Sequence, residues 1–222
     1  MMADAGTRKT NWAAIWISAG VVVLLVVVGA LVVWMNNQAT APAASPASAS
    51  IDSDTGAIRL GDGPDVLETY VDFMCPYCGH FEESWGDAIS EEVAAGNLTL
   101  EIYPVAILDR LSQGTAFSTR AANAMYCVAE SDPDAAYPFL DLMFGNQPAE
   151  STPGLSDEDI TALAERAGAG EAAECIASGA YNDFVAQTTK ALPGGGTPAV
   201  LLNGETLNWQ AAPEQELLPR LG

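Results

Sequence analysis

A long uncharged stretch opens the hydrophobic pattern of the chain. Residues 11–38 include no charged side chain, and positions 21–28 hold only valine and leucine. As a helix rising about 1.5 Å per residue, residues 12–35 are long enough to cross the ~30 Å hydrocarbon core of a bilayer. Trp12, Trp16 and Trp34 lie near the two ends, as aromatic side chains do at membrane interfaces. We therefore predict a single transmembrane helix over residues 12–35.

The charges around this span predict its orientation. Arg8 and Lys9 precede it and no basic residue follows closely, which by the positive-inside rule places residues 1–11 in the cytoplasm. The rest of the chain is then extracytoplasmic and tethered to the cell membrane. A cleaved signal peptide is the alternative, because small residues follow the span, although its apolar region would usually have only about 7–15 residues.

Composition separates the span from the rest of the chain. Residues 36–55 are rich in Ala, Pro and Ser, offer little apolar surface to bury, and predict an extended, mobile linker. Residues 51–222 contain 6 of the 8 basic residues and 28 of the 29 acidic ones, a formal net charge of −22. Such a surface repels phosphates, so we expect no nucleic-acid partner. The acidic exterior keeps an exported domain, predicted over residues 56–222, soluble.

The hydrophobic pattern of this domain begins as strand, helix and strand. Residues 66–73 are rich in β-formers and largely apolar, as in a strand covered on both faces. Apolar residues then recur every four positions over residues 81–93 and predict a helix that Gly96 ends. Alternation over residues 98–102 predicts a second strand. Strand, helix and parallel strand form a βαβ unit, so the predicted fold class is α/β.

Helix-forming sequence fills a long insertion, about residues 106–180, and a hairpin follows it. Ser156 can cap one of the helices, and acidic residues occupy the first turn after it. Near the end, the Asn203-Gly204 turn joins two short β-rich runs over residues 199–207 as a hairpin. The helices that we predict from the insertion to this hairpin cover residues 115–130, 134–144, 157–167, 171–177 and 181–192.

The motif CPYC, with Cys75 and Cys78, carries the candidate chemistry. A CxxC pair can be a redox pair, half of a metal site or a structural staple. His80 is the only histidine and no second CxxC occurs, so a metal site lacks ligands at workable spacing. A staple that closes so short a loop constrains the unfolded chain very little. We therefore interpret Cys75 and Cys78 as a redox pair.

The position of the motif between strand and helix assigns a role to each sulfur. Cys75 falls at the N-cap of the predicted helix and Pro76 at the first helical position, which proline favours. A Cys75 thiolate can accept the free backbone N–H groups there and lies at the positive end of the helix dipole, which lowers its pKa. Cys75 is then the attacking sulfur and Cys78 the resolving one. His80 is either a solvated side chain or a group that tunes the thiols.

The remaining cysteines, Cys127 and Cys175, lie in separate predicted helices of the exported domain, where disulfides persist. We predict that they form a structural disulfide, which would contribute about 4 kcal/mol in the chain-entropy model. Two buried free thiols and a second redox pair are the alternatives.

The order of these motifs resembles a known family. The strand-CPYC-helix unit, with Gly196-Thr197-Pro198 before a hairpin, resembles the thioredoxin superfamily, and the long helical insertion resembles its DsbA-like branch of exported disulfide oxidoreductases. The resemblance covers roughly residues 58–210. It implies a thioredoxin-like fold with no bound cofactor or metal. It also implies that Pro198 is a cis-proline beside the Cys75–Cys78 disulfide and that Thr197 offers its backbone to an extended substrate peptide. A trans proline that starts a strand is the alternative.

Two positions depart from that pattern. Many members carry a buried acidic residue six positions before the first cysteine, and here this position is Thr69. Glu68, Asp72 or a water molecule is then the candidate proton acceptor for the resolving thiol. The dipeptide between the cysteines lacks the histidine of the family's strongest oxidants, so the redox potential does not carry over.

Together, these features predict a membrane-tethered thiol-disulfide oxidoreductase. Its expected substrates are the cysteines of exported proteins that are folding, and a membrane redox partner would recycle the Cys75–Cys78 pair. A reductant or disulfide isomerase of the same fold, for example in cytochrome maturation, is the alternative within the class. A thioredoxin-fold module that binds a metal or a partner through these cysteines is the alternative from a different class.

Overall fold

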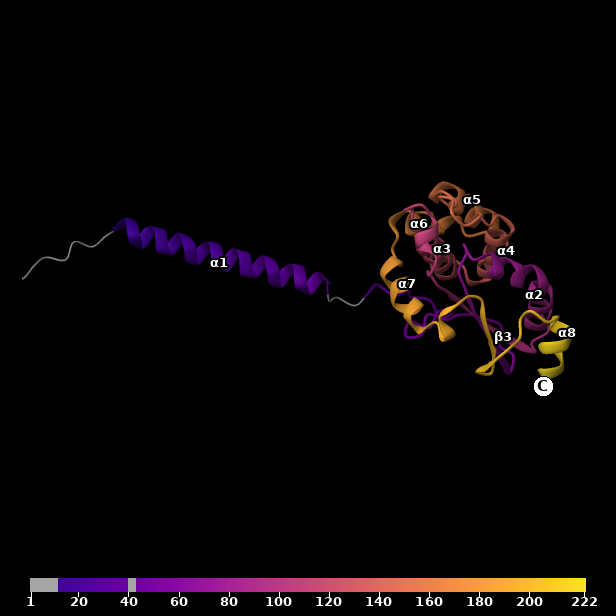
Figure 1. Ribbon diagram of the computed structural model, residues 1–222. Coiled ribbons are helices and arrows are strands. Elements are labelled where there is room, and N and C mark those ends of the chain that lie inside the picture. Colours follow the sequence, from indigo (N-terminus) through magenta and orange to yellow (C-terminus); the bar gives the residue numbers. More distant parts are fainter. Residues whose placement is uncertain (1–11, 40–42) are drawn as a thin grey trace, which may run out of the picture. The chain divides into compact units, whose positions relative to one another are not determined.

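The computed structural model describes residues 12–39 and 43–222 and divides the chain into two units, residues 1–42 and 43–222. The first unit contains the helix α1 (Trp12–Ala39) (Figure 1). Its apolar side chains over residues 21–28 are exposed. Within the described residues, no helix combines the length and the hydropathy that a membrane span requires. The transmembrane helix expected over residues 12–35 therefore stays a prediction, and the expected cytoplasmic residues 1–11 lie outside the described part.

The globular unit begins earlier than the sequence predicts. A mobile linker was expected over residues 36–55, but α1 continues to Ala39 and residues 43–55 belong to the folded unit. Ile51 is buried and forms an isolated antiparallel bridge with Ile58. The backbone N–H of Ala47 donates to the carboxylate of Glu130 at 2.7 Å. A single buried isoleucine among small residues produces no periodic hydrophobic pattern. The composition of residues 43–55 therefore predicted a linker where the chain is folded.

A five-stranded sheet forms the centre of this unit, in the order β1-β3-β2-β4-β5. Strands β2 and β3 are parallel, as the βαβ pattern predicts, and the other neighbouring pairs are antiparallel. Leu67 of β2 pairs with Leu100 of β3 and with Leu202 of β4, so β2 is the central strand. The strands are β1 (Ile58–Leu60), β2 (Asp65–Val71), β3 (Leu98–Pro104), β4 (Ala199–Leu202) and β5 (Glu205–Thr206).

Helix α2 (Pro76–Ala94) connects the two parallel strands. Its stripe of Phe81, Trp85 and Ile89 is buried, as the four-residue spacing predicts. The indole N–H of Trp85 donates to the carbonyl of Ala211 at 3.0 Å, just before the short C-terminal helix α8 (Pro213–Glu216). This bond ties the end of the chain to the helix that carries the CPYC motif.

The insertion packs around α3 (Phe117–Ser131), which is buried along most of its length. Ser156 caps α5 and its hydroxyl accepts the N–H of Asp159 at 3.1 Å. Pro138 lies in the first turn of α4, where its missing N–H would have no helical partner in any case. The other helices here are α4 (Ala136–Gly145), α5 (Asp157–Ala167), α6 (Ala173–Ser178) and α7 (Asn182–Thr188). Short 3-10 helices occur at Asp109–Leu111, Pro133–Ala135, Gly170–Ala172, Thr189–Ala191, Pro193–Gly195 and Leu218–Arg220.

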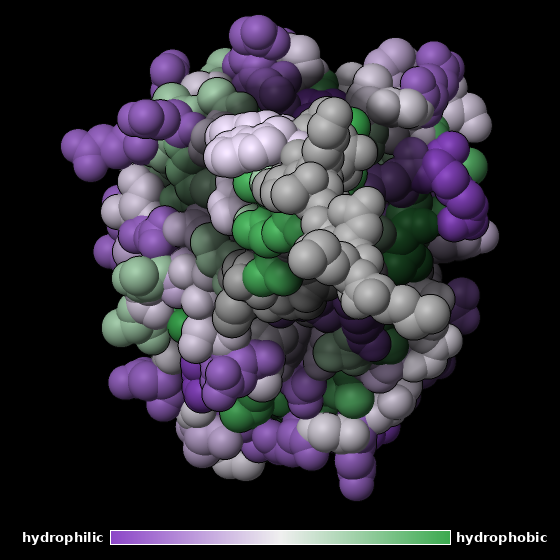
Figure 2. Space-filling view, turned by 90° about the vertical axis from the view of Figure 1, so that its left-hand side faces the viewer, coloured by the Kyte–Doolittle hydropathy of each residue, from purple (hydrophilic) through white to green (hydrophobic). Residues whose placement is uncertain are grey.

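The arrangement of layers places the start of α2 at one end of the sheet. Figure 1 shows α3 to α6 gathered together, with α2 and α8 on one side of the sheet and α7 on the other. On the face that Figure 2 shows, hydrophilic residues predominate around the periphery. This distribution is typical of a surface that faces water.

Candidate active site

The candidate site forms where β2 ends and α2 begins. Cys75 occupies the N-cap of α2 with an extended backbone (φ −77°, ψ 115°), and Pro76 follows at the first helical position. The N–H of Cys75 donates to the carbonyl of Asp72 at 2.9 Å, and the N–H of Cys78 donates to the carbonyl of Cys75 at 3.0 Å. Both cysteines are free thiols, with Cys75 5% exposed and Cys78 fully buried. The motif therefore has the N-cap geometry that its position in the sequence predicts.

The surroundings of the two sulfurs separate their pKa values. The pKa of Cys75 is lowered to about 6, first by a hydrogen bond with the Cys78 thiol and then by Thr197 and the backbone N–H groups of Cys78 and Tyr77, while burial opposes the change. Burial raises the pKa of Cys78 well above its usual range, and the neighbouring Cys75 sulfur adds to this. At neutral pH, Cys75 is therefore mainly a thiolate and Cys78 a thiol.

Thr197 and Pro198 meet this dithiol from the far end of the sequence. The peptide bond between them is cis, and Pro198 is buried. When Cys75 is protonated, its thiol donates to the carbonyl of Thr197 over 3.4 Å. The side chain of Thr197 helps to lower the pKa of Cys75. Its hydroxyl is buried and has no other hydrogen-bond partner among the described residues. The structure thus brings together the four predicted site residues, although Cys75 and Thr197 are 122 positions apart in the sequence. These residues are Cys75, Cys78, Thr197 and Pro198.

Thr69 stands where many family members carry a buried acidic residue. Its side chain is buried in β2, and its hydroxyl donates to the Glu101 carbonyl at 3.5 Å. Glu68, next to it, accepts a hydrogen bond from the hydroxyl of Tyr70 at 3.3 Å and is only partly buried. Neither side chain forms a hydrogen bond with Cys75 or Cys78. Of the candidate protein acceptors, Asp72 is the one beside the motif.

Asp72 is fully buried, and its carboxylate accepts four hydrogen bonds. Burial raises its pKa above the usual value, and the four donors oppose this only in part. Its backbone also lowers the pKa of Cys78. The donors are the N–H of Met74 (2.9 Å), the N–H groups of Ile107 (2.9 Å) and Leu108 (3.0 Å), and the hydroxyl of Ser118 (2.7 Å). Asp72 therefore anchors the loop before Cys75 to the beginning of the insertion.

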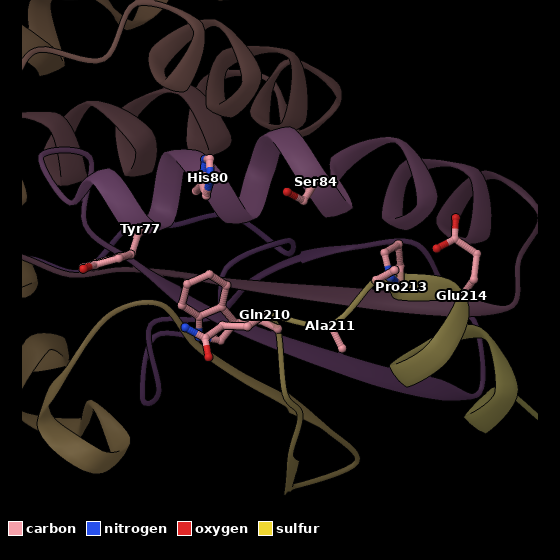
Figure 3. Close-up of a pocket in the computed structure, with 9 residues that line it drawn as sticks. Tyr77, His80, Ser84, Gln210, Ala211, Pro213 and Glu214 are labelled. Carbon is pink, nitrogen blue, oxygen red and sulfur yellow. The ribbon is translucent and has the colours of Figure 1, made fainter.

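A surface groove of about 550 Å³ lies beside the motif, between α2 and the segment before α8. Figure 3 shows Tyr77, His80 and Ser84 of α2 facing Gln210 and the residues that follow it. A second hollow of about 400 Å³ is lined by Pro198 and its neighbours, and Trp209 lines both hollows.

Tyr77 is 61% exposed and is the one large apolar side chain of residues 43–222 that the solvent reaches so fully. Its ring lies 6.2 Å from that of Trp209, centroid to centroid. No local pattern predicts Trp209 as a site residue, because it lies in an irregular segment whose position depends on long-range packing.

His80 lies on the surface of α2, with 74% of its side chain exposed and Nδ1 3.5 Å from the Glu83 carboxylate. In the part of the chain that the structure describes, no cluster of three or more His, Cys, Asp or Glu side chains is placed to hold a metal ion.

Cys127 of α3 and Cys175 of α6 form a disulfide, with their Cα atoms 5.7 Å apart and 48 positions between them in the chain. Cys127 is buried and Cys175 is partly buried. The bond joins two helices of the insertion.

Comparisons with known proteins agree with this geometry. The family model described as thioredoxin matches residues 56–217, and the chain belongs to that family. Among curated proteins, it is 34% identical over 161 residues to the serine/threonine-protein kinase PknE of Mycobacterium tuberculosis, a match that covers 66% of this chain but only 28% of that kinase.

Solved structures add neighbours whose own chains are covered over most of their length. Oxidised DsbA of Mycobacterium tuberculosis is 34% identical, with a TM-score of 0.64 and coverage of 69% of this chain and 85% of that one. Reduced DsbG of the same organism is 34% identical, with a TM-score of 0.63 and coverage of 69% and 80%. MdbA of Actinomyces oris, 21% identical over 77% of this chain and 86% of its own with a TM-score of 0.63, shows the fold alone. The thioredoxin-like fold with a helical insertion is confirmed, and the two mycobacterial neighbours support the predicted enzyme class, a thiol-disulfide oxidoreductase.

Proposed function

We propose that this chain is an extracytoplasmic, membrane-tethered thiol-disulfide oxidoreductase that oxidises cysteines of exported proteins. The observation that carries the proposal is the difference between the two thiols: the pKa of Cys75 is lowered to about 6, and the pKa of Cys78 is raised. A stabilised Cys75 thiolate favours the reduced form of the pair, which makes the Cys75–Cys78 disulfide a better oxidant.

The reaction begins with an oxidised pair and a reduced substrate. A substrate thiolate attacks the Cys75 sulfur, the Cys75–Cys78 bond breaks, and Cys78 leaves and takes up a proton. A second substrate thiolate then attacks the substrate sulfur of this mixed disulfide and releases Cys75 as a thiolate. Its low pKa makes Cys75 a good leaving group. The substrate has gained a disulfide and the pair has gained two electrons, which a membrane redox partner would accept.

The surface around Cys75 supports a peptide substrate. Cys75 is 5% exposed, and the groove beside it offers the aromatic rings of Tyr77 and Trp209. An extended peptide that passes Thr197 would bring its cysteine to the Cys75 sulfur while its neighbouring side chains rest in this groove. Unfolded or folding exported proteins present such extended segments.

The membrane tether rests on the first part of the sequence. The uncharged run over residues 11–38 and the basic pair Arg8 and Lys9 before it support a single span with the catalytic unit outside. Protease added to intact cells should then remove the domain. A domain that stays protected while known exported proteins are cut would contradict this topology.

Two measurements test the catalytic proposal. In Cys78→Ala, mixed disulfides between Cys75 and substrates should accumulate as reductant-sensitive bands of high mass, whereas Cys75→Ala should give few. The reduction potential of the pair should lie above about −200 mV, because an oxidant must exceed the range of common reductants. A potential near −270 mV or below would instead favour a reductant.

A further inference from the structure

Gln147 reaches from the helical insertion to the backbone of the CPYC motif. It lies two residues after the end of α4 and 72 positions after Cys75 in the sequence. Its side-chain Nε2 donates to the carbonyl of Cys75 at 2.8 Å and to that of Phe73 at 3.1 Å. One amide group therefore holds two carbonyls of the loop that joins β2 to α2.

The Cys75 carbonyl is also the first acceptor of α2. The N–H groups of Cys78 and Gly79 donate to it at 3.0 and 3.3 Å. Gln147 thus adds a third donor to the oxygen on which the first turn of the helix is built. This turn also carries the N–H groups of Tyr77 and Cys78, which stabilise the Cys75 thiolate.

Gly79 leaves the space that the amide of Gln147 occupies. A Cβ atom at position 79 would clash with Oε1 of Gln147 and would lie 3.2 Å from its Cδ. The backbone of Gly79 is not in the left-handed region, so only this close approach opposes a side chain there. Because Oε1 is the far end of a flexible side chain, an added methyl group would displace the amide and leave the fold intact.

We propose that Gln147 is a positioning residue for Cys75, through which the helical insertion fixes the active-site turn and sets the reactivity of the attacking sulfur. The proposal deepens the proposed function and rests on the same dithiol. It does not depend on the direction in which electrons flow. Without the amide, the carbonyl of Phe73 loses this donor and the loop from Phe73 to Cys75 has more freedom. The backbone N–H groups are then less well aimed at the Cys75 sulfur.

The test compares thiolate formation at Cys75 in the reduced full-length protein. Gln147→Met keeps the shape of the side chain but has no N–H to donate, and Gln147→Ala removes the side chain. The ultraviolet absorbance of the thiolate, followed against pH, should show the Cys75 midpoint raised by about 0.5–1 unit in both variants, a three- to tenfold fall in the ratio of thiolate to thiol. Asn146→Ala is the matched control, because it removes a neighbouring amide that donates only to the Leu142 carbonyl.

Gly79→Ala provides an independent route to the same change. Alone, it should raise the Cys75 midpoint in the same direction, because the new methyl group displaces the amide. In the Gln147→Ala background it should add no further shift, since its clashing partner is gone.

Three results would overturn the proposal: an unchanged midpoint in Gln147→Met, a loss of thermal stability with no change of midpoint, or shifts of the two substitutions that simply add. A raised midpoint in a protein whose potential proves reducing would support this proposal and contradict only the proposed oxidising role.

Discussion

The thiol of Cys75 donates to the backbone carbonyl of Thr197, and the Thr197 hydroxyl lies buried near the same sulfur. This hydroxyl contributes to the low pKa of Cys75 because it stabilises the thiolate. Thr197→Val keeps the shape and the carbonyl but removes the hydroxyl, so we expect the Cys75 pKa to rise above about 6.

The pH dependence of alkylation at Cys75 measures this change. Between pH 6 and 7, Cys75 of Thr197→Val should be alkylated more slowly than Cys75 of the wild type. At a pH where Cys75 is fully ionised in both proteins, the two rates should be equal. Thr69→Val is a matched control, since its buried hydroxyl donates to the Glu101 carbonyl instead. Equal midpoints in Thr197→Val and the wild type would refute the role of the hydroxyl.

Glu82 makes the folded state sensitive to pH. This residue of α2 is 9% exposed, and burial raises its pKa from 4.5 to about 7. A hydrogen bond with Tyr137 lowers the pKa, and the nearby charges of Asp141 and Asp87 raise it by smaller amounts. Because the folded pKa exceeds the unfolded one, the unfolded chain loses this proton first. The free energy of unfolding should therefore fall as pH rises from about 4.5 to about 7, and then stay level with respect to this group.

Replacing Glu82 with glutamine should remove this penalty. Glu82→Gln is expected to be more stable than the wild type above pH 7, by on the order of 2–3 kcal/mol, and to show little advantage at pH 4. Urea unfolding at the two pH values measures the difference. Glu83→Gln changes a neighbouring carboxylate whose side chain is 79% exposed, and it should have almost no effect. A gain of the same size at both pH values would show that the benefit comes from packing and not from ionisation.

Asp72 should be hard to replace, because all four of its hydrogen bonds are accepted by a buried carboxylate. Asp72→Asn turns an NH₂ group toward N–H donors and should lower the free energy of unfolding by about 3 kcal/mol or more. Ser118→Ala removes one of the four donors and should cost about 1–2 kcal/mol. Denaturant unfolding gives both values. An Asp72→Asn protein as stable as the wild type would show that the carboxylate is not an anchor.

The Cys127–Cys175 disulfide should affect stability and leave the chemistry of Cys75 alone. With 48 positions between its cysteines, removing it as Cys127→Ala/Cys175→Ala should lower the free energy of unfolding by about 4 kcal/mol. The Cys75 midpoint and the reduction potential of the first pair should stay as in the wild type. A variant that kept its stability but lost oxidising turnover would point to a second redox pair instead.

Local patterns account for what the sequence could predict. The spacing of Phe81, Trp85 and Ile89 specifies α2, and the run before Cys75 specifies β2, because each signal is complete within a few turns or residues. Ser156 specifies the start of α5 for the same reason. The three-residue edge strand β1 is too short to show alternation, and it was missed.

The contributions of distant residues to the site could not be predicted in this way. Gln147 and Trp209 have no local signal, because what each does depends on a contact with a segment about 70 or more positions away. Asp72 was one of three candidates for a proton acceptor, and only its burial and its four donors distinguish it from Glu68.

The central place of β2 has a consequence for the order in which the enzyme becomes active. On one side β2 pairs with β3, which is synthesised soon after it, but on the other side it pairs with β4, near the end of the chain. Thr197 comes just before β4. During synthesis, Cys75 leaves the ribosome long before the strand that brings Thr197 to its sulfur. The emerging chain therefore carries a thiol of more ordinary reactivity, and the attacking sulfur is completed only when the last part of the sheet is in place.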